Sequence, residues 1–151
     1  MLDYISNKNC PAILVSLDQE KAFDRVDWDF TFNLLHHYGF GDNFIRWVKL
    51  LYSEITSRII CNGDLTDSFR PSRGVRQGCP LSPLLYILVA EVLGCNIRAC
   101  DSIEGFRVPG GPIFKLTQYA DDTNCIVHDT FSLQKLLALT GKHGRGSGAK
   151  L

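Results

Sequence analysis

The sequence has no pair of cysteines at Cys-x-x-Cys spacing, and no cysteine has a histidine nearby at the spacing of a zinc ligand. This pattern argues against a structural zinc site. We expect these scattered cysteines to act as small, half-buried hydrophobic residues of a protein in a reducing compartment. The six cysteines are Cys10, Cys61, Cys79, Cys95, Cys100 and Cys125.

Long hydrophobic runs and a basic N-terminal segment are also missing. The first residues read MLDYISNKNCPAIL, and they do not place a basic start before an apolar run. We therefore expect no secretory signal. The longest apolar stretch, Leu84 to Val89, is too short to span a bilayer. These absences predict an intracellular protein, nuclear or cytoplasmic, that is not secreted and has no membrane partner.

The chain has no net charge, because 16 Lys and Arg residues balance 16 Asp and Glu residues. A net charge of zero neither requires nor excludes a polyanionic partner, because binding to a polyanion depends on how the charges are distributed over the surface. Four arginines lie between residues 58 and 76, and the stretch from Thr130 to Leu151 contains no acidic residue. Each cluster by itself is typical of a solvated face. The 151 residues, 45% of them hydrophobic, suit one domain with a substantial core.

Hydrophobic spacing predicts four helices, over about 28–38, 44–55, 82–98 and 132–139. Gly39 is expected to end the first, and the second is entered through polar capping residues at 42 and 43. Ser82 and Pro83 are expected to be the N-cap and first residue of the third helix. That helix is apolar nearly all round, so we expect it to be buried. Four glycines between 141 and 148 predict a flexible C-terminal stretch unless something outside the chain orders it.

Three segments of the sequence favour strands. The run AILVSL, residues 12–17, predicts a strand that is covered on both faces. Asn62-Gly63 lies between two extended pieces and predicts a hairpin turn. Residues 117–127, TQYADDTNCIV, predict a second hairpin. Strands interspersed with helices indicate an α+β fold, in which helices cover an antiparallel sheet.

Two adjacent carboxylates, Asp121 and Asp122, lie inside the second hairpin. Like charges repel, and burying either of them is costly unless it is paired. Mg²⁺ prefers oxygen ligands, and a further carboxylate, Asp18, ends the first expected strand. We hypothesise that Asp18 and Asp121 meet across neighbouring strands and share two metal ions. A double aspartate alone is more often a solvated hairpin tip, in which case Asp18 merely begins a turn.

Three motif-like segments follow one another along the chain: LVSLDQEKAFDRVDW (14–28), GVRQGCPLSPLLYILV (74–89) and QYADDTNCIV (118–127). Together they resemble three successive motifs of reverse transcriptases, particularly those encoded by non-LTR retrotransposons of the long interspersed element type. The resemblance runs from about residue 10 to the C-terminus. It implies a palm-like antiparallel sheet packed against helices and an RNA-directed DNA polymerase. It also implies two Mg²⁺ ions, or Mn²⁺, an RNA template, a DNA primer and deoxynucleoside triphosphates.

The resemblance assigns roles to particular residues. Asp18 and Asp121 correspond to catalytic metal ligands, and Asp122 is either a ligand or a group that shapes the local field. Phe23 corresponds to the aromatic residue that blocks the 2′-hydroxyl of a ribonucleotide, the group that distinguishes RNA from DNA building blocks. Tyr119 is expected either beneath the primer terminus or in the core.

The second motif adds residues that are expected to contact the nucleotide and the nucleic acid. Gln77 and Gly78 correspond to the loop beside the templating base and the incoming nucleotide, where glycine allows close approach of the backbone. Arg73 and Arg76 lie just before this loop and are expected to bind phosphates.

The resemblance is to part of the family's full enzyme. We expect residues 1–151 to be a partial domain, with a palm core over about 10–130 and the start of the next palm motif, cut short, over 131–151. The fingers and thumb are expected to be missing, so those regions or a partner are needed for efficient catalysis. Two other functions stay open: a catalytically inactive remnant that binds nucleic acid or a partner, and a two-metal nuclease. The nuclease leaves Phe23 and the Gln77-Gly78 loop without a role.

Overall fold

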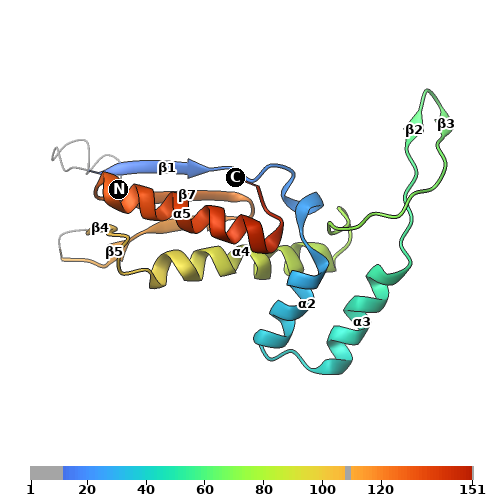
Figure 1. The fold of residues 1–151 in the computed structure, drawn as a ribbon, viewed down its shortest axis with the longest axis horizontal. Coiled ribbons are helices and arrows are strands. Elements are labelled where there is room, and N and C mark those ends of the chain that lie inside the picture. The colour runs from blue at the N-terminus through green and yellow to red at the C-terminus, as the bar shows by residue number, and fades with distance from the viewer. Residues whose placement is uncertain (1–11, 108–109, 151) are drawn as a thin grey trace.

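The computed structural model describes residues 12–107 and 110–150 of the chain. Its main sheet has three antiparallel strands in the order β1-β7-β6: β1 (Ile13–Leu17), β7 (Asp122–Val127) and β6 (Leu116–Tyr119). Two long helices, α4 (Leu81–Ala99) and α5 (Thr130–Ser147), pack against one face of this sheet (Figure 1). The antiparallel sheet covered by helices confirms the predicted α+β class.

The other elements are smaller or lie to one side of the sheet. A short 3-10 helix, η1, and two helices, α2 and α3, follow β1, and the β2-β3 hairpin projects away from the rest of the fold (Figure 1). Their bounds are η1 (Ala22–Arg25), α2 (Trp28–His37), α3 (Asp42–Ser53), β2 (Ile60–Cys61), β3 (Asp64–Leu65), β4 (Phe106–Arg107) and β5 (Ile113–Phe114).

Local signals explain the ends of α2 and the turn of the β2-β3 hairpin. The side chain of Asp27 accepts a hydrogen bond from the Phe30 N–H at 2.8 Å and caps α2. Gly39, with φ +79°, follows the end of α2 as predicted. The turn residues Asn62 and Gly63 both have positive φ, 51° and 92°, which two-residue hairpin turns require. At α3, in contrast, no side chain caps the N-terminus.

The prediction for the start of the long central helix was wrong by two residues. Helix α4 begins at Leu81 after Pro80, without a side-chain cap, so Ser82 and Pro83 lie inside its first turn. Proline is tolerated there because the first helical N–H groups have no intrahelical partner. Leu84 is 60% exposed, so the helix is not buried all round. By length and composition alone, α4 is the one helix of the described residues that is suited to cross a membrane.

Helix α4 passes through two hydrophobic clusters. Its N-terminal half packs with η1, α2 and α3. Its C-terminal half packs with the sheet and α5, where Leu93, Ile97, Val127 and Leu136 are almost completely buried. Truncating such a side chain to alanine generally costs about 2–5 kcal/mol. The helix therefore couples the sheet to the elements that follow β1.

The five described cysteines are all free, and Cys10 lies outside the described residues. Cys125 is fully buried in β7, and burial raises the pKa of its thiol to about 11. A thiol with this pKa is protonated at neutral pH, as expected of a cysteine that acts as a hydrophobic core residue.

The first strand is covered on one face and not, as predicted, on both. Burial alternates along β1, and Leu14 is 51% exposed. The alternation arises because α4 and α5 cover only one side of the three-stranded sheet, whereas the continuous apolar run does not reveal which side. The opposite face of the sheet carries the exposed residues Leu14, Ser16 and Thr117, and no described helix packs on it.

The C-terminal glycine-rich stretch is helical and not flexible. Helix α5 runs to Ser147, and its first turn is capped by Asp129, which accepts a hydrogen bond from the Ser132 N–H at 2.7 Å. Its far end is held by the Asp27 N–H, which donates to the Ser147 carbonyl at 3.1 Å. Lys150 forms an ion pair with Glu20 at 2.6 Å. Packing within the chain therefore overrides the low helix propensity of the glycines.

Candidate active site

The structure brings the three predicted carboxylates to one end of the sheet. β1 pairs with β7 up to Leu17 opposite Thr123, so the next residue, Asp18, lies level with Asp122. Asp121 belongs to the two-residue turn that joins β6 to β7. Continuing this register by one residue puts Asp18 level with Asp122, whereas the sequence predicts a pairing with Asp121, which lies one residue further, in the turn.

The turn between β6 and β7 is tight and strained. Tyr119 pairs with Asp122, which leaves only Ala120 and Asp121 to reverse the chain. Ala120 has φ +51°, a left-handed conformation that alanine rarely adopts. Such strain often concentrates at functional sites. Tyr119 is 84% exposed, which excludes the core position considered for it from the sequence.

The negative charge at this end of the sheet has no close counter-charge. Asp18 and Asp122 are exposed and Asp121 is half-buried. Among the residues that the structure describes, none of the three forms an ion pair with lysine, arginine or histidine. Three carboxylates without a counter-charge form the all-oxygen donor set that Mg²⁺ and Mn²⁺ prefer, so the residues fit the expected ions.

Phe23 lies beside this site on η1. It is half-buried, and its ring stacks on the ring of Tyr86 with centroids 4.8 Å apart and an interplanar angle of 14°. Burial raises the pKa of the Tyr86 hydroxyl, and the charges of Asp121 and Asp18 raise it further. Both carboxylates therefore lie within electrostatic reach of this hydroxyl.

Sequence reasoning missed Tyr86. The available signal was weak: a single aromatic residue with a polar atom, within the aliphatic run LLYILV of a helix expected to be buried. Nothing in that run indicates which distant residue the ring contacts.

Hydrogen bonds tie the loop of the second motif to the segment that carries Phe23. The Val75 N–H donates to the Phe23 carbonyl at 2.8 Å, and the Gly74 N–H donates to the Val26 carbonyl at 2.8 Å. The indole N–H of Trp28 donates to the Gly74 carbonyl at 2.7 Å. These three hydrogen bonds hold the start of the loop against η1 and the residues that follow it.

The predicted residues of this loop all lie on the surface: Arg73, Arg76, Gln77 and Gly78 are exposed. Gly78 has φ +83°, and a Cβ atom at this position would meet open space. At the end of the loop, a hydrogen bond from the Leu81 N–H lowers the pKa of the Cys79 thiol. The N–H groups at the start of α4 thus favour negative charge at the end of the loop.

Substituting Gly74 by alanine is expected to destabilise the fold by about 2–4 kcal/mol. Gly74 has φ +95°, and a Cβ atom would lie 2.9 Å from the Asp24 carbonyl oxygen. Gly39→Ala is the matched control, because Gly39 has φ +79° but open space around its Cβ position, and should cost only about 1 kcal/mol. Urea unfolding monitored by circular dichroism measures both. Equal losses would show that the Asp24 contact contributes nothing.

A second group of possible metal ligands lies at the opposite end of β7. Ligand atoms of Glu104, His128 and Asp129 lie within 4.8 Å of one another. Asp129 already caps α5 through its hydrogen bond with the Ser132 N–H. Helix capping thus accounts for this carboxylate without an ion.

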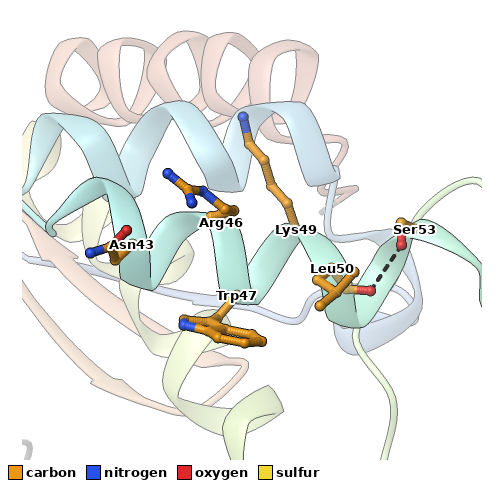
Figure 2. Close-up of a pocket in the computed structure, with 6 residues that line it drawn as sticks. All are labelled: Asn43, Arg46, Trp47, Lys49, Leu50 and Ser53. Atoms are coloured by element: carbon orange, nitrogen blue, oxygen red, sulfur yellow. Dashed lines mark hydrogen bonds between the residues drawn. The ribbon is translucent and has the colours of Figure 1, made fainter.

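A surface pocket lies on α3, and none of the three carboxylates lines it (Figure 2). It surrounds Trp47, which is 66% exposed. All its lining residues belong to this one helix, whose buried side chains pack in the cluster with α2 and the N-terminal half of α4. The residues are Asn43, Arg46, Trp47, Lys49, Leu50 and Ser53.

Known proteins resemble this chain in sequence and in fold. A family model described as reverse transcriptase (RNA-dependent DNA polymerase) matches residues 2–151. The chain is 32% identical over 151 residues to the Transposon TX1 uncharacterized 149 kDa protein of Xenopus laevis, covering 100% of the chain and 12% of that protein. It is 33% identical over 127 residues to the Retrovirus-related Pol polyprotein from type-2 retrotransposable element R2DM of Drosophila melanogaster. This match covers 84% of the chain and 12% of that protein.

A solved structure of apo telomerase from Candida tropicalis, truncated from its C-terminal domain, has a similar fold. The TM-score is 0.60, and the match covers 99% of this chain and 31% of that one. The two share 16% sequence identity, so this likeness shows the fold alone.

Proposed function

Because the chain belongs to the reverse transcriptase (RNA-dependent DNA polymerase) family, we propose that its carboxylate cluster is the active site of an RNA-directed DNA polymerase. One observation carries the proposal: Asp18, Asp121 and Asp122 lie together at the end of the sheet where β6 turns into β7. None of them pairs with a cationic side chain among the described residues. The substrates are an RNA template, a DNA primer and deoxynucleoside triphosphates. The retrotransposon relatives support a role in copying a retroelement inside the cell.

The reaction joins the 3′-hydroxyl of the primer to the α-phosphorus of the nucleotide and releases pyrophosphate. In this proposal Asp18 and Asp121 hold two Mg²⁺ ions, and Mn²⁺ can replace them. Bound ions would lower the pKa of the attacking hydroxyl and neutralise the negative charge of the triphosphate. Asp122, exposed beside Asp18, either completes the ligand set or adds negative charge that raises the affinity for cations.

Phe23 is proposed to select the sugar of the incoming nucleotide. The flat stack on buried Tyr86 supports this role, because it prevents the ring from turning inward to make room for a 2′-hydroxyl. The exposed loop beside Phe23 is proposed to contact the nucleotide through Gln77 and Gly78. Arg73 and Arg76 are proposed to bind phosphates of the nucleic acid, where charge-assisted hydrogen bonds are strong.

Titration of the chain with Mn²⁺, followed by the paramagnetic resonance signal of the free ion, tests the proposal directly. Asp121→Asn and Asp18→Asn should each weaken binding at least about tenfold, since even changes outside the ligand shell cost 10–100-fold. Asp101→Asn removes an exposed carboxylate from the turn after α4 and should leave binding unchanged. Binding that survives both site variants but disappears in His128→Ala would place the ion at the other end of β7.

A further inference from the structure

Tyr86 presents an unsatisfied polar atom in the middle of the fold. The residue is 2% exposed, and its hydroxyl oxygen has no hydrogen-bond partner among the described residues. Buried tyrosine hydroxyls nearly always have a partner, because burial removes their hydrogen bonds to water. The position therefore requires an explanation beyond packing.

Packing alone would be satisfied by phenylalanine. The Tyr86 ring stacks on Phe23, and a phenylalanine ring would fill the same space without burying an oxygen. The other large buried residues of this helix are aliphatic, such as Leu85, Val89 and Leu93. Besides the small Ser82 at the start of the helix, the Tyr86 hydroxyl is the buried side-chain polar group that α4 carries.

The packing of α4 against β6 indicates what the hydroxyl can bind. Lys115 donates to the Arg98 carbonyl at 3.0 Å and Gln118 to the Ala90 carbonyl at 3.4 Å, so α4 runs antiparallel to β6. Tyr86 lies one helical turn before Ala90, on the side of the turn that holds Asp121.

Besides burial, two carboxylates raise the pKa of Tyr86, with Asp121 the stronger of the two and Asp18 the weaker. The hydroxyl therefore lies in the negative field of the site, which favours an O–H that donates toward a carboxylate. Asp121 is also the half-buried member of the carboxylate set, so a donor from the protein interior can reach it more readily than exposed Asp18.

We propose that Tyr86 is a positioning residue of the metal site, whose hydroxyl donates a hydrogen bond to the Asp121 carboxylate when that carboxylate binds an ion. The same ring holds Phe23 in place, so one residue orients both a metal ligand and the residue that selects the sugar. This inference rests on the proposed function, because it takes Asp121 as a metal ligand. Donors of this kind orient ligand oxygens, and their loss typically weakens metal binding 10–100-fold.

Tyr86→Phe tests the hydroxyl without removing the ring. In the Mn²⁺ titration, this variant should bind about tenfold more weakly than the parent chain. Tyr52→Phe is the matched control, because Tyr52 is another buried tyrosine of the same hydrophobic cluster, located on α3. It should bind Mn²⁺ like the parent chain. Circular dichroism checks that both variants keep the fold.

A spectroscopic measurement separates positioning from packing. In a chain with ¹³Cζ-labelled tyrosine, the Tyr86 resonance is the one that disappears in Tyr86→Phe. On addition of Mg²⁺ this resonance should shift in the parent chain and stay in place in Asp121→Asn. A purely structural tyrosine would show no shift in either.

The outcomes distinguish this inference from the function on which it rests. If Asp121→Asn loses Mn²⁺ while Tyr86→Phe binds it as tightly as the parent chain and the resonance does not shift, the role of Tyr86 is refuted and the metal site stands. If the parent chain shows no binding that depends on Asp121, both are refuted. Weaker binding by Tyr86→Phe together with the Mg²⁺-dependent shift supports both.

Discussion

Primer extension on an RNA template is expected to fall at least about 10²–10³-fold when Asp121 is replaced by asparagine, the loss typical of removing one preorganised electrostatic group from an active site. Asparagine has nearly the same size as aspartate, so the tight turn between β6 and β7 should be kept. It removes one negative charge and replaces one of the two carboxylate oxygens with an NH2 group, which cannot coordinate a cation. The effect should therefore appear in the chemical step more than in stability.

The measurement uses the purified chain, a labelled DNA primer on an RNA template, and Mg²⁺ or Mn²⁺. Positioning of substrates can account for roughly 7–11 kcal/mol of a barrier. The chain spans 12% of its TX1 relative, so slow extension is expected from these residues alone. Asp101→Asn should extend the primer like the parent chain. Equal extension by Asp121→Asn would place the chemistry at other residues, and Mn²⁺ binding without any extension would favour the inactive remnant.

Features that depend on the local backbone could be predicted from the sequence. Gly39 after α2 and Asn62-Gly63 in the hairpin each have the positive φ that these residue types accommodate. The approach of Asp18 to the double aspartate also follows from local signals, although the sequence predicts a pairing with Asp121 and the register brings Asp18 level with Asp122. One residue ends a strand and the other begins one next to a tight turn, and antiparallel pairing then brings them together.

Features that depend on distant parts of the chain could not be predicted. The apolar run of β1 is compatible with one or two covered faces, and only the docking of α4 and α5 decides between them. Helix α5 continues through its glycines because its end is held by Asp27 and Glu20, which precede it by most of the chain. Tyr86 was not singled out from the sequence, and only the tertiary fold places its ring against Phe23.

Replacing Phe23 with alanine is expected to reduce the discrimination against ribonucleotides by about 10²-fold, the scale on which apolar pockets accept or reject small polar differences between substrates. The half-buried ring next to the carboxylates would act as a wall beside the sugar, and alanine removes that wall. Buried Tyr86 stays in place beneath the vacated space, so the gap should open toward the nucleotide and not collapse into the core.

Single-nucleotide insertion kinetics measure the effect as the ratio of kcat/KM for a deoxynucleotide to kcat/KM for the matching ribonucleotide. Phe32→Ala is the matched control: Phe32 is also a half-buried aromatic packed against the same hydrophobic cluster, but it lies on α2 under Lys49. It should cost similar stability and leave the ratio unchanged.

The form of the change matters as much as its size. If Phe23 acts by excluding the 2′-hydroxyl, kcat/KM for the ribonucleotide should rise in Phe23→Ala, because an obstacle specific to that sugar has been removed. If Phe23 only supports the fold, kcat/KM should fall equally for both nucleotides, as it would in Phe32→Ala. An unchanged ratio would therefore reject the selecting role even if Phe23→Ala proved less active, whereas a gain in ribonucleotide insertion has no explanation in lost packing.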